Sequence, residues 1–239
     1  MHEQSVRPAS ATSGLGAAFQ QTLPIILGYV PVGFAYGVLA QKSGLSGINT
    51  VLMSILVFAG SGQLIAVGLF AALANPLTII MTTFIVNLRH LLMSAALAPY
   101  LNSWSKTRLA LFAAQMTDET FALHVGRFAK GQLGQRQTFG INVIAHSAWV
   151  GGTVLGLAAS TLITDIKPIG LDYALAAMFI ALLIGQSKSR LHVLVGIVAG
   201  VLSTVLLQAG LTQAHVLTAT IISATFGLGV YVWTSKRSS

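Results

Sequence analysis

The chain of 239 residues contains no cysteine and few charged residues of any kind. The lack of cysteine excludes disulfide bonds, thiolate nucleophiles and cysteine-ligated metals. Charged residues make up 8% of the chain, whereas a typical soluble domain has about 25%. Hydrophobic residues account for 54%. This composition predicts an all-α integral membrane protein, because hydrocarbon leaves helices as the main way to satisfy the backbone.

The few charges are mostly positive, with 13 Lys and Arg against 5 Asp and Glu and a net charge of +8. Proteins that bind nucleic acid gather such cations into a patch or stripe. Here the cations lie singly or in small groups between apolar runs. That placement is typical of residues that set membrane orientation through the positive-inside rule. We therefore expect a lipid bilayer, and no nucleic acid, as the surrounding partner.

Several apolar runs reach the roughly 20 residues that a spanning helix needs. The eight runs lie at about 23–41, 50–74, 76–100, 108–125, 138–163, 172–187, 191–209 and 213–234. The fourth run is short and carries Gln115, Asp118 and Glu119. Eight runs therefore predict seven or eight membrane spans, and the fourth decides between them.

The distribution of cations favours seven spans. If all eight runs cross, the loops divide eight cations against four. If 108–125 does not cross fully, only Arg7 and Lys167 remain on one side, and the other side holds ten cations: Lys42, Lys106, Arg108, Arg127, Lys130, Arg136, Lys188, Arg190, Lys236 and Arg237. This larger bias fits the positive-inside rule better. We expect a re-entrant or broken segment near 108–125 and a cytoplasmic C-terminus.

The two ends of the chain differ in character. Residues 1–20 are rich in Ser, Ala and Gln and lack a continuous apolar core, so we expect a polar tail and not a signal peptide. Residues 21–239 have no soluble linker and are expected to form one transmembrane domain. Gly33 and Gly37 in the first run have the same small-xxx-small spacing as Gly152 and Gly156 in the fifth. With seven spans, this similarity suggests an inverted repeat.

Ionisable residues lie where the bilayer centre should be. Asn87, Arg89 and His90 follow Pro76 by about 10 to 14 residues, roughly mid-membrane at 1.5 Å per residue, and Asp118 and Glu119 interrupt the fourth run. Such groups are costly and mark ion or substrate pathways. One interpretation is a structural salt bridge between the two segments. The other is a site where Arg89 binds a carboxylate and an acid binds an ammonium group, with His90 or an acid carrying protons.

Two other runs contain helix-breaking residues. Pro31, flanked by Gly28 and Gly33, predicts a kink or an unwound stretch in the first run. Gly60, Ser61, Gly62 and Gln63 interrupt the centre of the second run. Interrupted helices expose backbone groups and often mark transporter binding sites. The alternative is close helix packing, with Gln63 hydrogen-bonded across an interface.

No catalytic, phosphate-binding or metal-binding motif accompanies these features. We expect neither an enzyme nor a metal or cofactor. Besides a transporter, the polar residues are compatible with a channel, in which they keep a pore hydrated. They are also compatible with a membrane scaffold in which charges join two subunits. An intramembrane enzyme is the least favoured alternative.

Four segments, LPIILGYVPVGFAYG, FAGSGQ, NLRH and MTDETFAL, occur in this order over most of the chain. Together they resemble the AzlC family, the large subunit of two-component exporters of branched-chain amino acids. The resemblance implies a bacterial inner-membrane protein that works with a small AzlD-type subunit. It also implies export of leucine, isoleucine or valine, and in some members of methionine or toxic analogues. Because outward transport against a gradient needs a driving force, we expect the proton gradient to supply it. Family members often carry an acid at the position of Asn87, which here is neutral.

Overall fold

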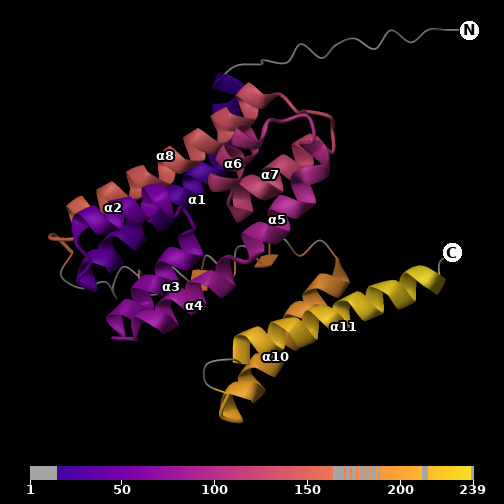
Figure 1. Cartoon of the computed structure of the whole chain (residues 1–239). Coiled ribbons are helices and arrows are strands. Elements are labelled where there is room, and N and C mark those ends of the chain that lie inside the picture. The colour runs from indigo at the N-terminus through magenta and orange to yellow at the C-terminus, as the bar shows by residue number, and fades with distance from the viewer. Residues whose placement is uncertain are drawn as a thin grey trace, which may run out of the picture. The chain divides into compact units, whose positions relative to one another are not determined.

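The described part of the chain consists of helices joined by short connections (Figure 1). The computed structural model describes residues 15–163, 189–211 and 215–237, together with isolated positions between 170 and 187. The elements are α1 (Leu15–Lys42), α2 (Gly47–Leu56), α3 (Gly60–Ala71), α4 (Pro76–Asn87), α5 (Arg89–Leu97), η1 (Ala98–Tyr100), α6 (Lys106–Ala114), α7 (Asp118–Phe128), α8 (Gln135–Ala159), α10 (Arg190–Gln208) and α11 (His215–Arg237). The all-α prediction is thus confirmed for these residues. The apolar run 172–187 and the tail before residue 15 lie largely outside them.

Within the described residues, four helical stretches are long and apolar enough to cross a membrane: Leu15–Lys42, Pro76–Tyr100, Gln135–Ala159 and Arg190–Gln208. The chain divides into two compact units near residue 178. The first contains the elements from α1 to α8. In the second, α10 packs against α11.

α1 and α8 form the most extensive helix pair of the first unit and lie side by side (Figure 1). Two glycines from each helix allow this close approach. A Cβ on Gly33 would lie 2.8 Å from the Trp149 carbonyl oxygen, and one on Gly152 would lie 2.6 Å from that of Val30. The two small-xxx-small motifs noted in the sequence therefore pack on each other. This is the backbone contact that such motifs allow between membrane helices.

The first run forms one continuous helix through Pro24 and Pro31. The unwound stretch predicted at Pro31 is thus absent, while a kink there stays a prediction. A proline removes one helical hydrogen bond, but the contacts of Gly33 and Gly37 with α8 hold the helix beyond it. α1 begins at Leu15, so residues 15–20, assigned to the polar tail by composition, form its first turns.

Other runs are broken, as predicted for the second and fourth. The second run is interrupted at residues 57–59, three residues earlier than expected, where Phe58 has a φ of 44°. A positive φ is rare for a bulky residue. Gly60–Gln63 then form the first turn of α3, with the Gln63 amide donating to the Ala59 carbonyl at 2.8 Å. The fourth run is divided into α6 and α7 at residues 115–117.

Local signals explain where the shorter helices begin. Asn75 accepts a hydrogen bond from the Thr78 amide at 2.8 Å, with Pro76 in the first turn of α4. Thr117 caps α7 through a reciprocal pair of bonds with Thr120. Such side-chain caps satisfy amides that have no partner within the helix.

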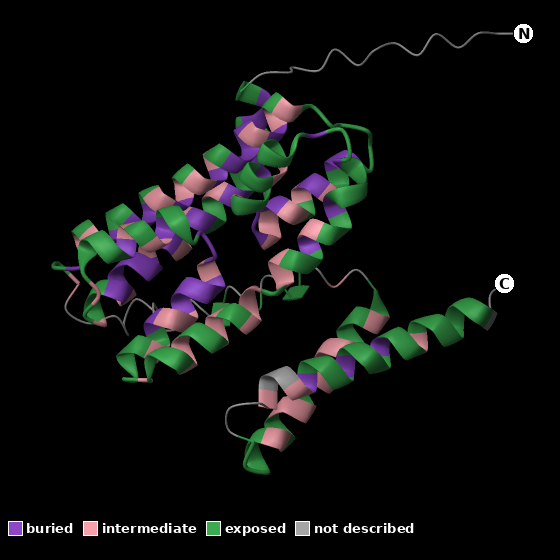
Figure 2. Cartoon of the chain, viewed as in Figure 1, coloured by how far each residue is buried: buried purple, intermediate pink, exposed green. Residues whose placement is uncertain are grey.

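Burial in the first unit is concentrated along α1, α3, α7 and α8 (Figure 2). The stretch Pro76–Tyr100 is different, because only 6% of its apolar window is buried. Ile80, Phe84 and Leu91 on this stretch are each at least 60% exposed. Contiguous apolar surface of this kind marks contact with lipid or another protein.

The contact between α1 and α8 leads to a test with two adjacent glycines. Gly152→Ala would place a methyl group on the Val30 carbonyl of α1, whereas a Cβ on Gly151 meets nothing within 4 Å. We expect Gly152→Ala to destabilise the protein by about 1–3 kcal/mol through overpacking. Gly151→Ala should be neutral or slightly stabilising, because alanine has the higher helix propensity. Thermal unfolding in detergent micelles measures the difference. Equal midpoints for the two variants would contradict this account of the packing.

Candidate functional site

Three helix interruptions place polar residues in the turns that follow them. Ser61 lies in the first turn of α3, Arg89 begins α5 after the interruption at Leu88, and Asp118 begins α7. The first amides of a helix have no acceptor within it, so they and the helix dipole favour negative groups. Each interruption therefore brings a polar side chain into the apolar bundle at the start of a helix.

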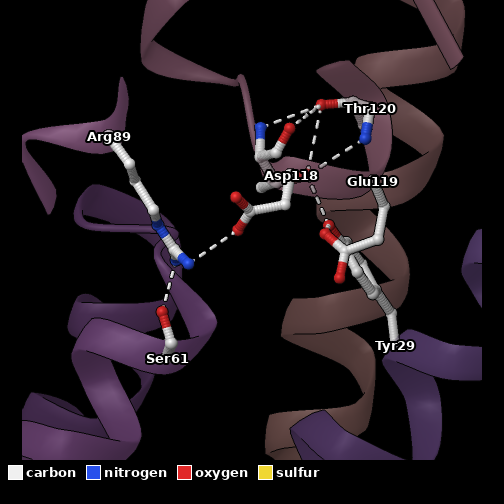
Figure 3. A network of polar contacts seen from close by, with 7 residues as sticks. Tyr29, Ser61, Arg89, Asp118, Glu119 and Thr120 are labelled. Carbon is white, nitrogen blue, oxygen red and sulfur yellow. Dashed lines mark hydrogen bonds and ion pairs between the residues drawn. The ribbon is translucent and has the colours of Figure 1, made fainter. Parts of the chain in front are cut away.

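Arg89 joins these three interruptions (Figure 3). Its Nη1 atom lies 2.9 Å from Asp118 Oδ2, and its Nη2 atom donates a hydrogen bond to Ser61 Oγ. The side chains of Arg89 and Asp118 are 24% and 12% exposed. The predicted pairing of the third run with 108–125 is present, and Asp118 is the acid that makes it. Arg89 Nε has no hydrogen-bond partner among the described residues, so within them the guanidinium retains an unused donor.

Glu119 points away from Arg89 towards α1 (Figure 3). The hydroxyl of Tyr29 donates a hydrogen bond to Glu119 Oε2 at 2.6 Å and lies 2.5 Å from Thr117 Oγ1. Tyr29 and Thr117 are each only 6% exposed. The two adjacent acids thus have separate partners: Asp118 pairs with α5, and Glu119 with α1.

Thr117 fixes the position of both acids. The Thr120 amide donates to Thr117 Oγ1 at 3.4 Å, and the Thr117 amide donates to Thr120 Oγ1 at 2.9 Å. Because these bonds begin α7 at Asp118, the two acids occupy its first turn, where negative charge is favoured.

The glycines of the second run allow close contacts beside Arg89. A Cβ on Gly60 would lie 2.8 Å from Cη2 of Trp149, and one on Gly62 would lie 2.9 Å from Nδ2 of Asn87. Asn87 therefore packs against the first turn of α3. Asn87 Oδ1 and His90 Nε2 are buried atoms that find no hydrogen-bond partner in the part of the chain that the structure describes.

Gln63 does not face Arg89. Its side-chain amide donates to Ser54 Oγ at 3.2 Å, and Trp149 Nε1 donates to Gln63 Oε1 at 3.1 Å. It is completely buried, so these bonds account for both ends of the amide. This arrangement matches the alternative interpretation of a polar group bonded across a helix interface. Pro31 lies in the continuous helix α1.

Two residues of this arrangement escaped the sequence analysis. Tyr29 lies among apolar residues and has no local signal besides its hydroxyl. Thr117 could have been found, because a threonine directly before two acids is typical of a helix N-cap. His146 Nε2 lies 3.1 Å from the Ser54 carbonyl oxygen, and the His146 ring stacks on that of Phe58 with the ring centroids 4.1 Å apart. It therefore contacts α2 and the interruption that follows it.

A second polar cluster lies farther along α7. His124 Nε2 is 2.7 Å from Asn142 Oδ1, and Arg127 donates to Gln137 Oε1 at 2.8 Å. These bonds join α7 to α8. Within the described residues, no group of three or more His, Cys, Asp or Glu could hold a metal ion.

Comparison with known proteins assigns the family. Residues 24–163 match the family described as AzlC protein, which is more than half of the chain. The chain belongs to the AzlC family. A protein of Archaeoglobus fulgidus named uncharacterized membrane protein is 34% identical, over 92% of this chain and 95% of its own length.

Two further relatives have more specific names. The inner membrane protein YgaZ of Escherichia coli is 29% identical over 84% of this chain and 86% of its own length. The branched-chain amino acid transport protein AzlC of Bacillus subtilis is 28% identical over 80% of this chain and 76% of its own length. No solved structure matches the chain. The family resemblance found in the sequence is thus confirmed, and the four segments that carry it lie mostly within the matched region.

Proposed function

We propose that this AzlC-family chain exports branched-chain amino acids across the bacterial inner membrane. The observation that carries the proposal is the ion pair between Arg89 and Asp118, held where three helices are interrupted. The name of the Bacillus subtilis relative, a branched-chain amino acid transport protein, supports the substrate class. Leucine, isoleucine and valine are the main substrates in this proposal, with methionine and toxic analogues as further ones.

The ion pair has the polarity that a zwitterion requires. A free amino acid carries a carboxylate and an ammonium group on the same carbon. In the proposal, the carboxylate binds Arg89 and the amides at Gly60–Gly62, since helix N-termini favour anions. The ammonium group binds Asp118, the acid that pairs with Arg89. The substrate therefore replaces each half of the ion pair with a charge of the same sign. That exchange avoids leaving an unpaired charge at membrane depth.

Movement of the broken helices would then open the site to each side in turn. The segments around residues 57–59 and 115–117 are short connections between half-helices, and discontinuous helices form the binding sites of many transporters. Outward transport against a gradient needs a driving force, and the proton gradient is the proposed one. A small AzlD-type subunit completes the exporter, and the exposed apolar side of Pro76–Tyr100 provides surface for protein or lipid.

Export from cells tests this function. Cells are preloaded with labelled leucine, valine and methionine, with the chain produced either alone or together with its small subunit. We expect saturable efflux that depends on both subunits. Arg89→Ala and Asp118→Ala should each lower it by at least about tenfold, the equivalent of about 1.4 kcal/mol. Arg108→Ala is the matched control, because Arg108 is an exposed cation on α6.

Two results would contradict the proposal. Normal efflux in both site variants, with the complex assembled, would remove the ion pair from the pathway. A lack of efflux of any of the three amino acids by the assembled wild-type complex would refute the substrate class. Flux that does not saturate would indicate a channel instead of an exporter.

We further propose that 106–128 enters the membrane and returns without crossing it, which leaves seven spans and a cytoplasmic C-terminus. α6 has 9 residues and α7 has 11, lengths of about 14 Å and about 17 Å at 1.5 Å per residue. Each is much shorter than the roughly 30 Å hydrocarbon core. The interruption at residues 115–117 contains Thr117, which bonds to Tyr29 of α1, so protein covers this backbone as the membrane interior demands.

Cysteine labelling tests this topology without removal of any native thiol. Ser103→Cys precedes α6 and Gln132→Cys follows α7, and both positions are exposed. A membrane-impermeant maleimide should reach both from the same side. Ala72→Cys is the control, because Pro76–Tyr100 separates it from Ser103, and it should label from the opposite side. Labelling of Ser103→Cys and Gln132→Cys from opposite sides would establish eight spans.

A further inference from the structure

Two consecutive acids begin α7, yet they face different parts of the protein (Figure 3). Asp118 is 2.9 Å from Arg89 Nη1. Within the described residues, the Glu119 side chain is hydrogen-bonded by a hydroxyl group, Tyr29 Oη at 2.6 Å. Within the described part of the chain, no cation forms an ion pair with Glu119. One acid is therefore compensated by a fixed positive charge and the other is not.

An uncompensated carboxylate at membrane depth is costly. Tyrosine and threonine hydroxyls offer hydrogen bonds but no charge, so they reduce this cost only in part. A proton removes the charge altogether. Glu119 is thus the acid of this site whose surroundings suit both a protonated and an ionised carboxyl group, since a carboxyl group only accepts hydrogen bonds when ionised and donates one when protonated.

We propose that Glu119 is the group that takes up and releases the coupling proton, and that Tyr29 transmits its protonation state to α1. This inference rests on the proposed function, because it names the coupling residue of the same site. Asp118 has a different role in it, as the charge that Arg89 and the substrate exchange.

The step involves one proton and no other change in bonding. A proton from the water on the outer side adds to a carboxylate oxygen of Glu119, and release to the cytoplasm removes it. In the ionised state the Tyr29 hydroxyl donates to Oε2. In the protonated state Glu119 donates, and the Tyr29 hydrogen is free to turn to Thr117 Oγ1, which lies 2.5 Å away. The bond between α7 and α1 therefore differs between the two states.

The bond that changes on protonation joins α1, which is rigidly packed, to α7, which follows an interruption. α1 is held to α8 by backbone contacts at Gly33 and Gly152, whereas α7 is one half of a broken segment. The first turn of α7 is attached to α5 through Asp118 and to α1 through Glu119. Protonation changes the second attachment and substrate binding changes the first. Adjacent residues of one helical turn thus couple the two events.

The other titratable groups around Glu119 are less suited to carry the proton. Arg89 stays protonated in proteins, and Asp118 is its partner. His90 is beside Arg89 on α5, where a second positive charge would lie next to the guanidinium. His146 on α8 already contacts the Ser54 carbonyl oxygen. Tyr29 on α1 is the partner of Glu119 and not a separate candidate.

The test separates binding from coupling in vesicles that contain the purified complex of this chain and its small subunit. Two fluxes of labelled leucine are measured: exchange against unlabelled leucine with no pH gradient, and net transport driven by an imposed pH gradient. Wild type should perform both. Glu119→Gln keeps the size and hydrogen bonds of the side chain but cannot ionise. It should retain exchange and lose net transport driven by the pH gradient.

Three variants make the result specific. Glu119→Asp retains an acid and should recover part of the driven transport. Tyr29→Phe removes the hydroxyl and retains the ring, so it should keep exchange and shift the pH at which driven transport is half-maximal. Asp118→Asn should lose both fluxes, because it removes a charge that the substrate needs. Replacing sodium by choline should leave every flux unchanged.

Each contrary outcome overturns a defined claim. Driven transport by Glu119→Gln equal to that of wild type would overturn the assignment of the proton to Glu119, and so would a Glu119→Asp variant as inactive as Glu119→Gln. Loss of driven transport with choline in place of sodium would show that sodium, and not the proton, is the coupling ion. An absence of leucine exchange in the wild-type complex would instead refute the proposed function.

Discussion

An arginine at membrane depth must find an anion or water, and Arg89 finds Asp118. This requirement accounts for much of the arrangement around it. The pair can form only if the first turn of α7 reaches the start of α5, which demands the interruption at residues 115–117. The hydrogen bond from Arg89 to Ser61 likewise requires α3 to begin in the middle of an apolar run. Each of the three interruptions would be unfavourable alone in hydrocarbon, but Arg89, Asp118 and Ser61 at these interruptions bond to one another.

The rest of the first unit provides a rigid support for this site. α1 and α8 approach closely enough that the carbonyl oxygens of one helix contact the glycines of the other. Buried hydrogen bonds of Gln63 with Ser54 and Trp149 fasten α2 and α3 to α8. Continuous helices therefore form the scaffold, and the half-helices that begin at Gly60, Arg89 and Asp118 carry the polar groups. Movement during transport is expected of the half-helices, because small changes at short connections can reorient them.

The sequence was sufficient to predict the helical class, the family, and the pairing of Arg89 with the acidic segment. Composition and the length of the apolar runs predict the helical class, and the high cost of an isolated charge in a membrane predicts the pairing of Arg89. The sequence could not choose between Asp118 and Glu119, because adjacent residues of a helix point in directions about 100° apart and the choice depends on tertiary placement. Tyr29 was missed for the same reason, since its hydroxyl acquires a role only through Thr117 and Glu119.

The glycines show how the same residue type supports different structures. Gly60 and Gly62 weaken a helix by propensity, which predicted a break at their own positions. The break lies instead at Phe58, and both glycines serve close contacts with Trp149 and Asn87. Propensity located the break to within a few residues, while packing decided the details. Pro31 is unfavourable inside a helix, yet α1 continues past it, because Gly33 and Gly37 pack against α8.

In the proposed function, Arg89 binds the carboxylate of the amino acid and Asp118 binds its ammonium group. Equilibrium binding of labelled leucine to the purified complex tests it most directly, with wild type, Arg89→Gln, Asp118→Asn and the double variant. We expect each single variant to weaken leucine binding by about tenfold to a hundredfold, or about 1.4–2.8 kcal/mol. In the double variant, the two losses should not add, because the residues contact each other. Unchanged leucine affinity in both single variants would contradict the account.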